Sequence, residues 1–188
     1  MSPRRGGQST QSGIFYQNSV AALFLGRLCD NADSPLEQQV IQVRVETPDK
    51  VDDIVVKFAD EHKLFIQAKE NIVTSDKAWK KLWQDFEAQY LDSGFNSEVD
   101  RLKLQMGRER SELRTLQSLC EHASTALSPD EWMKSLSSVE KKLLEKIRPI
   151  LSFQFWNDDT LWTFFRHIEI GIWTLTQRSD TCLDACDQ

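Results

Sequence analysis

The sequence predicts an α/β domain, and three observations lead to that prediction. Apolar residues recur at helical spacing near the amino terminus, and three short β-like runs follow between residues 40 and 69. Helical spacing then returns and dominates the rest of the chain, interrupted by short β-like runs. The chain has 188 residues, 40% of them hydrophobic and 28% charged, which is enough for one sizeable core and excludes a largely disordered protein.

The first predicted element is a helix. Residues 1–12 are rich in Ser, Gly and Gln and are expected to form a flexible arm. From Gly13 to about Cys29 the apolar positions have helical spacing, and the turn-forming run 31–35 ends the helix. Its apolar segment Val20–Leu25 is too short to cross a bilayer, and no secretory signal is recognised. We therefore expect a soluble, cytoplasmic protein without a membrane partner.

Three strands and a second helix follow. The strands are expected at Val40–Thr47, Val51–Ala59 and Lys63–Lys69, and the polar residues 60–62 predict a hairpin turn between the last two. The helix is expected from Asp76 to Tyr90, with apolar residues on one face and lysines on the other.

The remainder is predicted to be mainly helical. Arg101–Met106 has the pattern of a fourth strand, and helical spacing resumes after Gly107. Ser128 is a helix-capping residue before a proline, so a helix is expected from there to about Arg148. His167–Thr174 is a candidate last strand. We divide the chain into a core over 13–107 and a helical extension over 108–188, which either completes the domain or leads to a further domain.

Charge and cysteine content narrow the function classes. The net charge is −6, which argues against a protein that only coats nucleic acid, although a local basic face can still dock it. The four cysteines lack the CxxC spacing of a zinc site, so reduced structural thiols are expected. Most of the six tryptophans are expected in the core or an interface.

One group of polar residues interrupts the apolar strands. If the hairpin turn is centred on Glu61, Asp53 lies opposite Lys69, and Gln67 lies on the same side of the sheet. Glu46, at the end of the preceding strand, can join them. Charged groups at the end of an apolar strand pair are costly unless they are compensated, which a divalent cation can do.

The donor types suit magnesium, with manganese as a possible substitute. The expected ligands are the Asp53 carboxylate, the Gln67 amide oxygen and the Ala68 backbone carbonyl, because magnesium prefers hard oxygen donors. Lys69 can then stabilise charge on a phosphate or help to activate water. This chemistry is metal-assisted phosphodiester hydrolysis.

These residues occur within a longer pattern that resembles a known family. The pattern comprises the segments Gly13–Gln17, Val45–Glu46, Val51–Ile54 and Ile66–Lys69. It is similar to the PD-(D/E)xK restriction-endonuclease-like nucleases, specifically the Mrr-type branch with a QxK motif. It looks like the double-stranded DNA endonuclease domain at the amino terminus of bacterial antiphage effectors. The resemblance covers about residues 13–75.

The resemblance implies a fold, a set of roles and a setting. The fold is a restriction-endonuclease-like mixed sheet with a helix-strand-strand-strand-helix-strand core. Asp53 would be the metal-binding acid, Gln67 the replacement for the usual acid, and Lys69 the catalytic lysine. Gln17 would occupy the position of a first-helix Glu or Gln, and Glu46 is also carried over as a catalytic residue.

In that family the nuclease precedes a sensor, either a cyclic-oligonucleotide-binding SAVED domain or a NACHT/STAND NTPase. The resemblance therefore implies a bacterial protein, a longer chain, and activation by homo-oligomerisation.

Several interpretations stay open from the sequence. Lys77, Lys80 and Lys81 either follow DNA phosphates or form a solvated face. A second set of basic residues has the same two interpretations: Arg108, Arg110 and Arg114. The fold could also serve as a non-catalytic module for assembly or nucleic-acid docking, or as an RNase.

Overall fold

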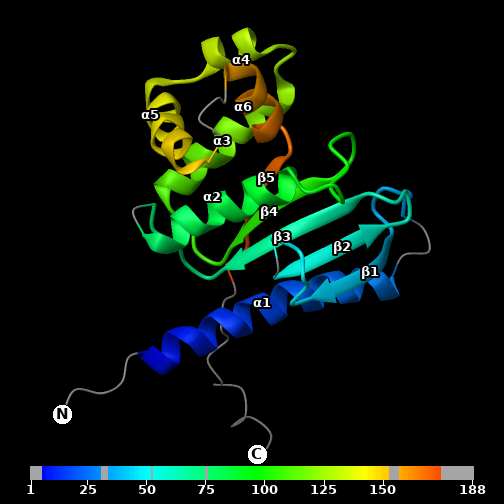
Figure 1. The fold of residues 1–188 in the computed structure, drawn as a ribbon. Coiled ribbons are helices and arrows are strands. Elements are labelled where there is room, and N and C mark those ends of the chain that lie inside the picture. The colour runs from blue at the N-terminus through cyan, green and yellow to red at the C-terminus, as the bar shows by residue number, and fades with distance from the viewer. Residues whose placement is uncertain (1–5, 31–33, 52, 75, 153–156, 175–188) are drawn as a thin grey trace, which may run out of the picture.

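The structure is a computed structural model that describes residues 6–30, 34–51, 53–74, 76–152 and 157–174. It has the predicted α/β architecture, with a five-stranded sheet between helices (Figure 1). The strands lie side by side in chain order: β1 (Val40–Val45), β2 (Ile54–Phe58), β3 (Lys63–Lys69), β4 (Arg101–Met106) and β5 (Ile168–Ile172). The pairs β1–β2 and β2–β3 are antiparallel, whereas β3–β4 and β4–β5 are parallel, so the sheet is mixed.

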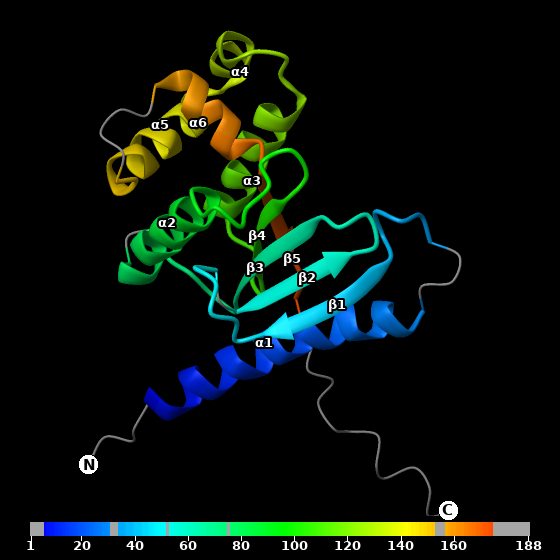
Figure 2. The ribbon, with the colours of Figure 1, turned by 45° about the vertical axis from the view of Figure 1, so that its right-hand side comes forward.

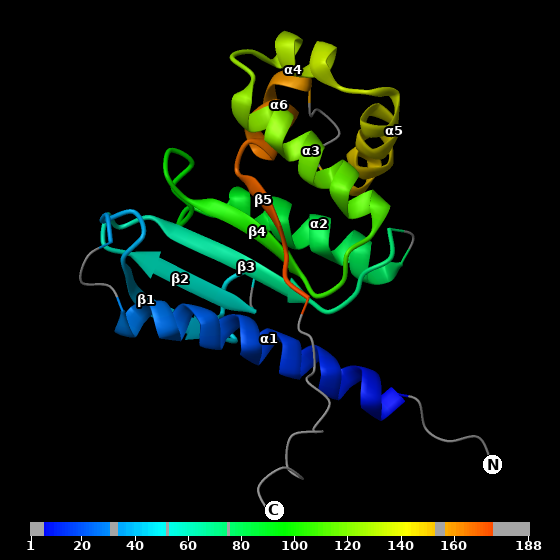
Figure 3. The same cartoon turned by 180° about the vertical axis from the view of Figure 1, so that it is seen from behind.

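The helices lie on both faces of the sheet. Helix α1 (Gly6–Cys29) runs along one face and projects beyond it, while the other helices lie on the opposite side (Figures 1 and 3). These are α2 (Lys77–Tyr90), α3 (Ser111–Thr125), α4 (Pro129–Ser135), α5 (Ser138–Ile147), the 3₁₀ turn η1 (Arg148–Ile150) and α6 (Asp158–Phe165). Among the described residues, no helix combines the length and the apolar character that a membrane span requires.

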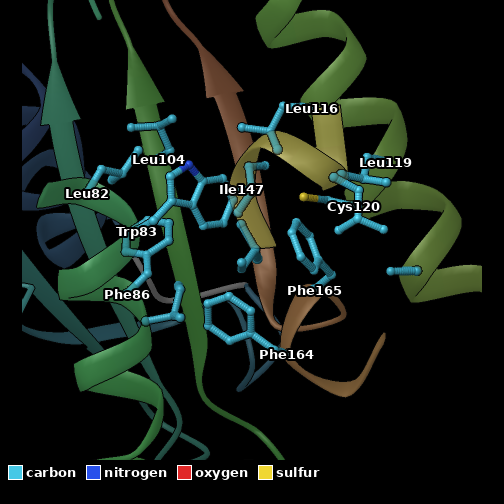
Figure 4. Close-up of a cluster of buried hydrophobic side chains, with 14 of the residues drawn as sticks. Leu82, Trp83, Phe86, Leu104, Leu116, Leu119, Cys120, Ile147, Phe164 and Phe165 are labelled. Carbon is cyan, nitrogen blue, oxygen red and sulfur yellow. The ribbon is translucent and has the colours of Figure 1, made fainter. Parts of the chain in front are cut away.

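The sheet separates two hydrophobic cores. The smaller core packs α1, through residues such as Tyr16 and Phe24, against β1, β2 and β3. The larger core joins α2 and the carboxyl-terminal helices to the opposite face of the sheet. Trp83 is fully buried at its centre, where its ring contacts Phe86 and Phe165 (Figure 4). Such aromatic contacts add to the stability that burial of apolar area already provides.

The carboxyl-terminal part belongs to the same sheet and core. Strand β5 pairs with β4, and helices α3 and α6 supply residues to the larger core. The described residues between 108 and 174 therefore pack into the same sheet and core as the residues before them. Residues 175–188, at the end of the predicted helical extension, lie outside the described residues, and Cys182 and Cys186 are among them. Cys29 and Cys120 are free thiols, as predicted.

Two helix predictions differ from the structure. Helix α1 begins at Gly6, so part of the predicted arm is helical; the Ser12 hydroxyl in this extension hydrogen-bonds Glu70 and ties it to the end of the sheet. The single helix predicted from Ser128 to Arg148 is two helices. Ser137 forms a capping box with Glu140 and starts α5 as a new helix, which sequence periodicity alone does not reveal.

The predicted register of the β2–β3 hairpin is wrong by two residues. Val55 lies opposite Phe65, not opposite Gln67. The turn closes between Phe58 and His62 because Glu61 adopts a left-handed conformation with φ of 75°, as in three-residue hairpin loops. Continued along the strands, this register places Asp53 opposite Gln67.

Candidate functional site

The predicted site residues meet at one end of the sheet. Asp53 immediately precedes β2, and Gln67, Ala68 and Lys69 form the carboxyl end of β3. Side chains alternate along a strand, so Asp53, Gln67 and Lys69 face the same side as the buried Phe65 of the larger core. The face that carries α2 therefore also carries these three polar side chains.

Three donors converge on one oxygen of the Asp53 carboxylate. The Gln67 amide Nε2 and the Ala68 backbone N–H donate to Asp53 Oδ2, the latter at 2.8 Å. Lys69 Nζ donates to the same oxygen at 3.0 Å and forms a salt bridge with it. Asp53 is 9% exposed, and burying a carboxylate is costly. The Lys69 ammonium group and the two hydrogen bonds offset that cost.

An unpartnered oxygen lies in the same cluster. Gln67 is 3% exposed, and its Oε1 is buried without a hydrogen-bond partner. A buried acceptor of this kind is costly unless a donor, a water or a cation meets it. The N–H and C=O groups of one strand residue point toward the same neighbouring strand. Since the Ala68 N–H donates to Asp53, the Ala68 carbonyl points to that side of β3 as well.

This donor set fits a hard divalent cation. A carboxylate, an amide oxygen and a backbone carbonyl are all ligand types that magnesium accepts while keeping several waters. Across the described ranges, no three His, Cys, Asp or Glu side chains gather closely enough to hold a metal ion. A cation at Asp53 would therefore be held by mixed oxygen donors, as the sequence predicts.

Gln17 and Glu46 contact the backbone of Asp53. Gln17 Nε2 donates to the Asp53 carbonyl at 3.3 Å, and the Glu46 N–H donates to the same carbonyl at 3.1 Å. Glu46 has a φ of 49°, a left-handed conformation that glutamate rarely adopts and that often marks functional sites. Both residues thus hold the Asp53 backbone in place, and the Glu46 side chain is exposed to solvent.

The predicted phosphate-binding lysines lie at the start of α2. All three, Lys77, Lys80 and Lys81, are exposed, and Lys81 forms a salt bridge with Asp85 at 2.6 Å. Figure 1 shows α2 beginning beside the carboxyl end of β3, where Lys69 lies. The first turn of α2 contains no acidic residue, so Asp76 at the N-cap is the acidic group that lies between the positive end of the helix dipole and the lysines.

The arginines that follow β4 have protein partners. Arg108 forms a salt bridge with Glu70 at 2.8 Å, and Arg110 donates to Asn71 at 2.9 Å. Arg114 pairs with Glu109. Hydrogen bonds from Ser12 and from Arg108 hold the pKa of the Glu70 carboxyl below its ordinary value. These contacts join the ends of β3 and β4 beside the Asp53 cluster.

Sequence reasoning missed one residue that positions the site. Gln89 lies on α2, is 2% exposed, and accepts hydrogen bonds from the backbone N–H groups of Lys50 and Val51 at 2.9 and 3.3 Å. It therefore holds the segment that leads into Asp53. A polar residue on the buried face of a predicted helix was the only available signal, and it does not identify a partner 38 residues away.

Comparison with models of protein families, with curated proteins and with solved structures found no significant match.

Proposed function

We propose that this protein is a metal-dependent endonuclease that hydrolyses phosphodiesters of double-stranded DNA. The observation that carries the proposal is the cluster at the end of β2 and β3. There the Gln67 amide nitrogen and the Lys69 ammonium group donate hydrogen bonds to a nearly buried carboxylate, while the oxygen of the same amide is buried without a partner. A buried acceptor without a partner costs free energy, and a cation bound at this oxygen would offset that cost.

The arrangement of elements supports a restriction-endonuclease-like core. Helix α1 is followed by three antiparallel strands, then by α2, and then by a strand parallel to β3. The acid precedes the second strand, and the QxK motif ends the third. This is the element order and motif placement that the sequence resemblance implies.

Asp53, the Gln67 amide oxygen and the Ala68 carbonyl would hold a magnesium ion. Bound there, magnesium would supply an activated water and would neutralise charge on the phosphate. Lys69 is 35% exposed and already contacts the acid, so it can also donate to a phosphate oxygen at the edge of the site. Gln17 and Glu46 hold the Asp53 backbone, which is a positioning role.

The lysines of α2 provide a surface for the DNA backbone. Lys77 and Lys80 are exposed on the helix that lies on the same side of the sheet as Asp53. Phosphate contacts of this kind require no sequence recognition. They also allow a chain with a net charge of −6 to dock on a polyanion through one local face.

The wider setting in this proposal rests on the sequence resemblance. The domain would be the effector of a bacterial antiphage defence protein whose longer chain carries a SAVED or NACHT/STAND sensor. Its activation would require homo-oligomerisation, because one hydrolytic site cuts one strand at a time. The protein would act in the bacterial cytoplasm.

A substrate panel tests the proposal against an RNase and against a non-catalytic module. Labelled double-stranded DNA, single-stranded DNA and single-stranded RNA are incubated with the protein in magnesium or in EDTA. We expect magnesium-dependent cutting of double-stranded DNA. Cutting confined to RNA would establish the RNase alternative. Binding of DNA without cutting at any concentration of magnesium or manganese would establish the docking module.

A further inference from the structure

The outward face of α1 lacks the charged residues that a solvated helix usually carries. From Gly6 to Gly26 the sequence contains no charged residue, although 28% of the chain is charged. One side of the helix is already buried against the sheet through Tyr16, Val20 and Phe24. The opposite side carries four large apolar side chains and no charge, and a helix with large apolar residues on both sides is expected to be covered on both.

The exposed, uncharged residues of this side form a regular stripe. The side chains concerned are all exposed: Gln11, Phe15, Asn18, Ala22, Leu25 and Cys29, flanked by Ile14 and Leu28. The first six are separated by alternating steps of four and three residues, which is the spacing of a coiled-coil seam. Phe15 is 58% exposed and Ile14 is 54% exposed, so the largest members are the least covered. We call these eight residues the α1 stripe.

We infer that the α1 stripe binds the α1 stripe of a second copy of this chain, with the two helices antiparallel. The sequence of steps reads the same in both directions, so it matches itself when one helix is reversed. In that arrangement Phe15 faces the partner's Leu25, and Asn18 faces the partner's Ala22. A large pair, Phe15 with Leu25, thus lies on either side of the two-fold axis, and the smaller Asn18 and Ala22 meet near the axis.

The absence of charge on the stripe and the open space at Gly26 favour a second copy of this chain as its partner. Since no charged residue lies between Gly6 and Gly26, reversing one helix on the other opposes no like charges. Ile14 would lie over the partner's Gly26, which has nothing within 4 Å of where a Cβ would stand. Depletion of charge in an apolar patch is the compositional mark of an interface core.

A stable pair sets the area that the stripe has to bury. Specific dimers bury about 1,200 Å² in total, or about 600 Å² from each copy, which is about 75 Å² for each of the eight side chains. The four large apolar members, Ile14, Phe15, Leu25 and Leu28, are 37–58% exposed and would supply most of it. The helix lies outside the sheet and away from helices α2–α6 in every view, so a second copy can approach it (Figures 1, 2 and 3).

Pairing through α1 would connect the candidate sites of the two copies. Gln17 lies on the same helix and contacts Asp53 through its backbone carbonyl. Two catalytic clusters would thus be joined through one rigid helix pair. The dimer itself does not rest on the proposed function, and its test measures mass and cross-linking rather than DNA cleavage.

The first experiment is light scattering on the eluting protein over a wide range of concentrations. We expect a mass of twice 21.8 kDa for the wild type. Leu25→Lys should raise the dissociation constant about tenfold or more, because it places an ammonium in the seam. Val139→Lys is the matched control, since Val139 is an exposed apolar residue on α5 and lies outside the stripe. A monomeric wild type, or a dimer unaffected by Leu25→Lys, would overturn the inference.

The second experiment gives a positive signal for the register. In a Cys182→Ser/Cys186→Ser background, Gln11→Cys should form an interchain disulfide with the partner's Cys29 on mild oxidation. Ser19→Cys, which lies off the stripe, should not. Disulfide-linked dimers formed by the background protein alone would indicate a parallel pair with Cys29 facing Cys29, and would refute the antiparallel arrangement.

Discussion

At the scale of single residues, the candidate site is an incomplete hydrogen-bond network. Asp53 Oδ2 receives the Gln67 amide, the Ala68 N–H and the Lys69 ammonium, while Gln67 Oε1 receives nothing. Leaving the Gln67 amide oxygen unpaired at the apolar end of a strand costs free energy. A bound oxygen-seeking cation would correct it, and this is why the amide oxygen is the most informative atom in the cluster.

Substitution at Gln67 tests the cation directly. Gln67→Glu adds a negative charge beside Asp53, so we expect lower thermal stability than wild type without magnesium and a larger gain in melting temperature on its addition. Gln67→Met removes the oxygen at similar volume and should abolish the magnesium-dependent gain. The measurement is thermal unfolding across a magnesium titration. Gln84→Glu, on the exposed side of α2, should behave like wild type, and equal responses in all four proteins would exclude the cation site.

The Asp53 carboxylate also carries stability. Asp53→Ala would leave the buried Gln67 amide and the Ala68 N–H without their acceptor, which we expect to lower the free energy of unfolding by about 1–3 kcal/mol. Asp53→Asn keeps an acceptor oxygen and should cost less. Urea unfolding of both variants measures the difference, and a more stable Asp53→Ala protein would mean that the three donors are satisfied elsewhere.

At the scale of elements, the sequence predicted the strands and helices better than their turns. Short apolar runs on either side of a polar turn located β2 and β3, because both strands are buried on both faces of the sheet. It could not fix their register, because that depends on the left-handed conformation of Glu61, a residue type that gives no such signal. The error moved the partner of Asp53 by two residues and left all three polar side chains on one face.

Gly107 lies where α1 packs closely against the end of the sheet. A Cβ there would lie 2.9 Å from Tyr16 Cε2 and 3.0 Å from Glu70 Cα. Gly107→Ala should therefore lower the free energy of unfolding by about 1–3 kcal/mol. Gly13→Ala is the control, because nothing lies within 4 Å of its Cβ position and alanine favours a helix by about 0.5–1 kcal/mol. Urea unfolding of the two variants measures both effects, and Gly107→Ala matching wild type would refute the close packing.

His167 links the stability of β5 to pH. Burial against Tyr90 and Phe95 lowers its pKa below 6.5, aided by Arg101 and Arg166, while the Asp100 carbonyl and the Asp100 carboxylate oppose the shift. The unfolded chain therefore takes up a proton first as the pH falls below about 6.5. The free energy of unfolding should therefore decrease as the pH falls from about 6.5 to the pKa of His167 in the folded protein. At lower pH, His167 should contribute no further change.

Urea unfolding above and below pH 6.5 measures this slope. His167→Phe should remove it, because the ring stays in the aromatic cluster without a titrating group. His62→Gln, on the hairpin turn, should retain it. An unchanged slope in His167→Phe would assign the pH dependence to other groups.

At the scale of the whole molecule, the sheet separates two surfaces with different character. One face carries α2, the larger core and the polar cluster at Asp53, and the other carries α1 with its uncharged outer stripe. The sequence predicted which residues could supply chemistry, because Asp53, Gln67 and Lys69 interrupt apolar strands. It could not predict Gln89, Arg108 or Arg110 as supports for that site, because each has a partner far away in the chain.

The most direct measurement is cleavage of supercoiled plasmid DNA in magnesium by wild type and Lys69→Met, purified in the same way. The wild type should convert the plasmid to nicked and linear forms, and only when magnesium is present. Lys69→Met, which removes the ammonium at similar size, should lose this activity, while Lys134→Met on exposed α4 should keep it. Equal magnesium-dependent cutting by wild type and Lys69→Met, or none by any of the three proteins across the full magnesium range, would contradict a nuclease site at Asp53, Gln67 and Lys69.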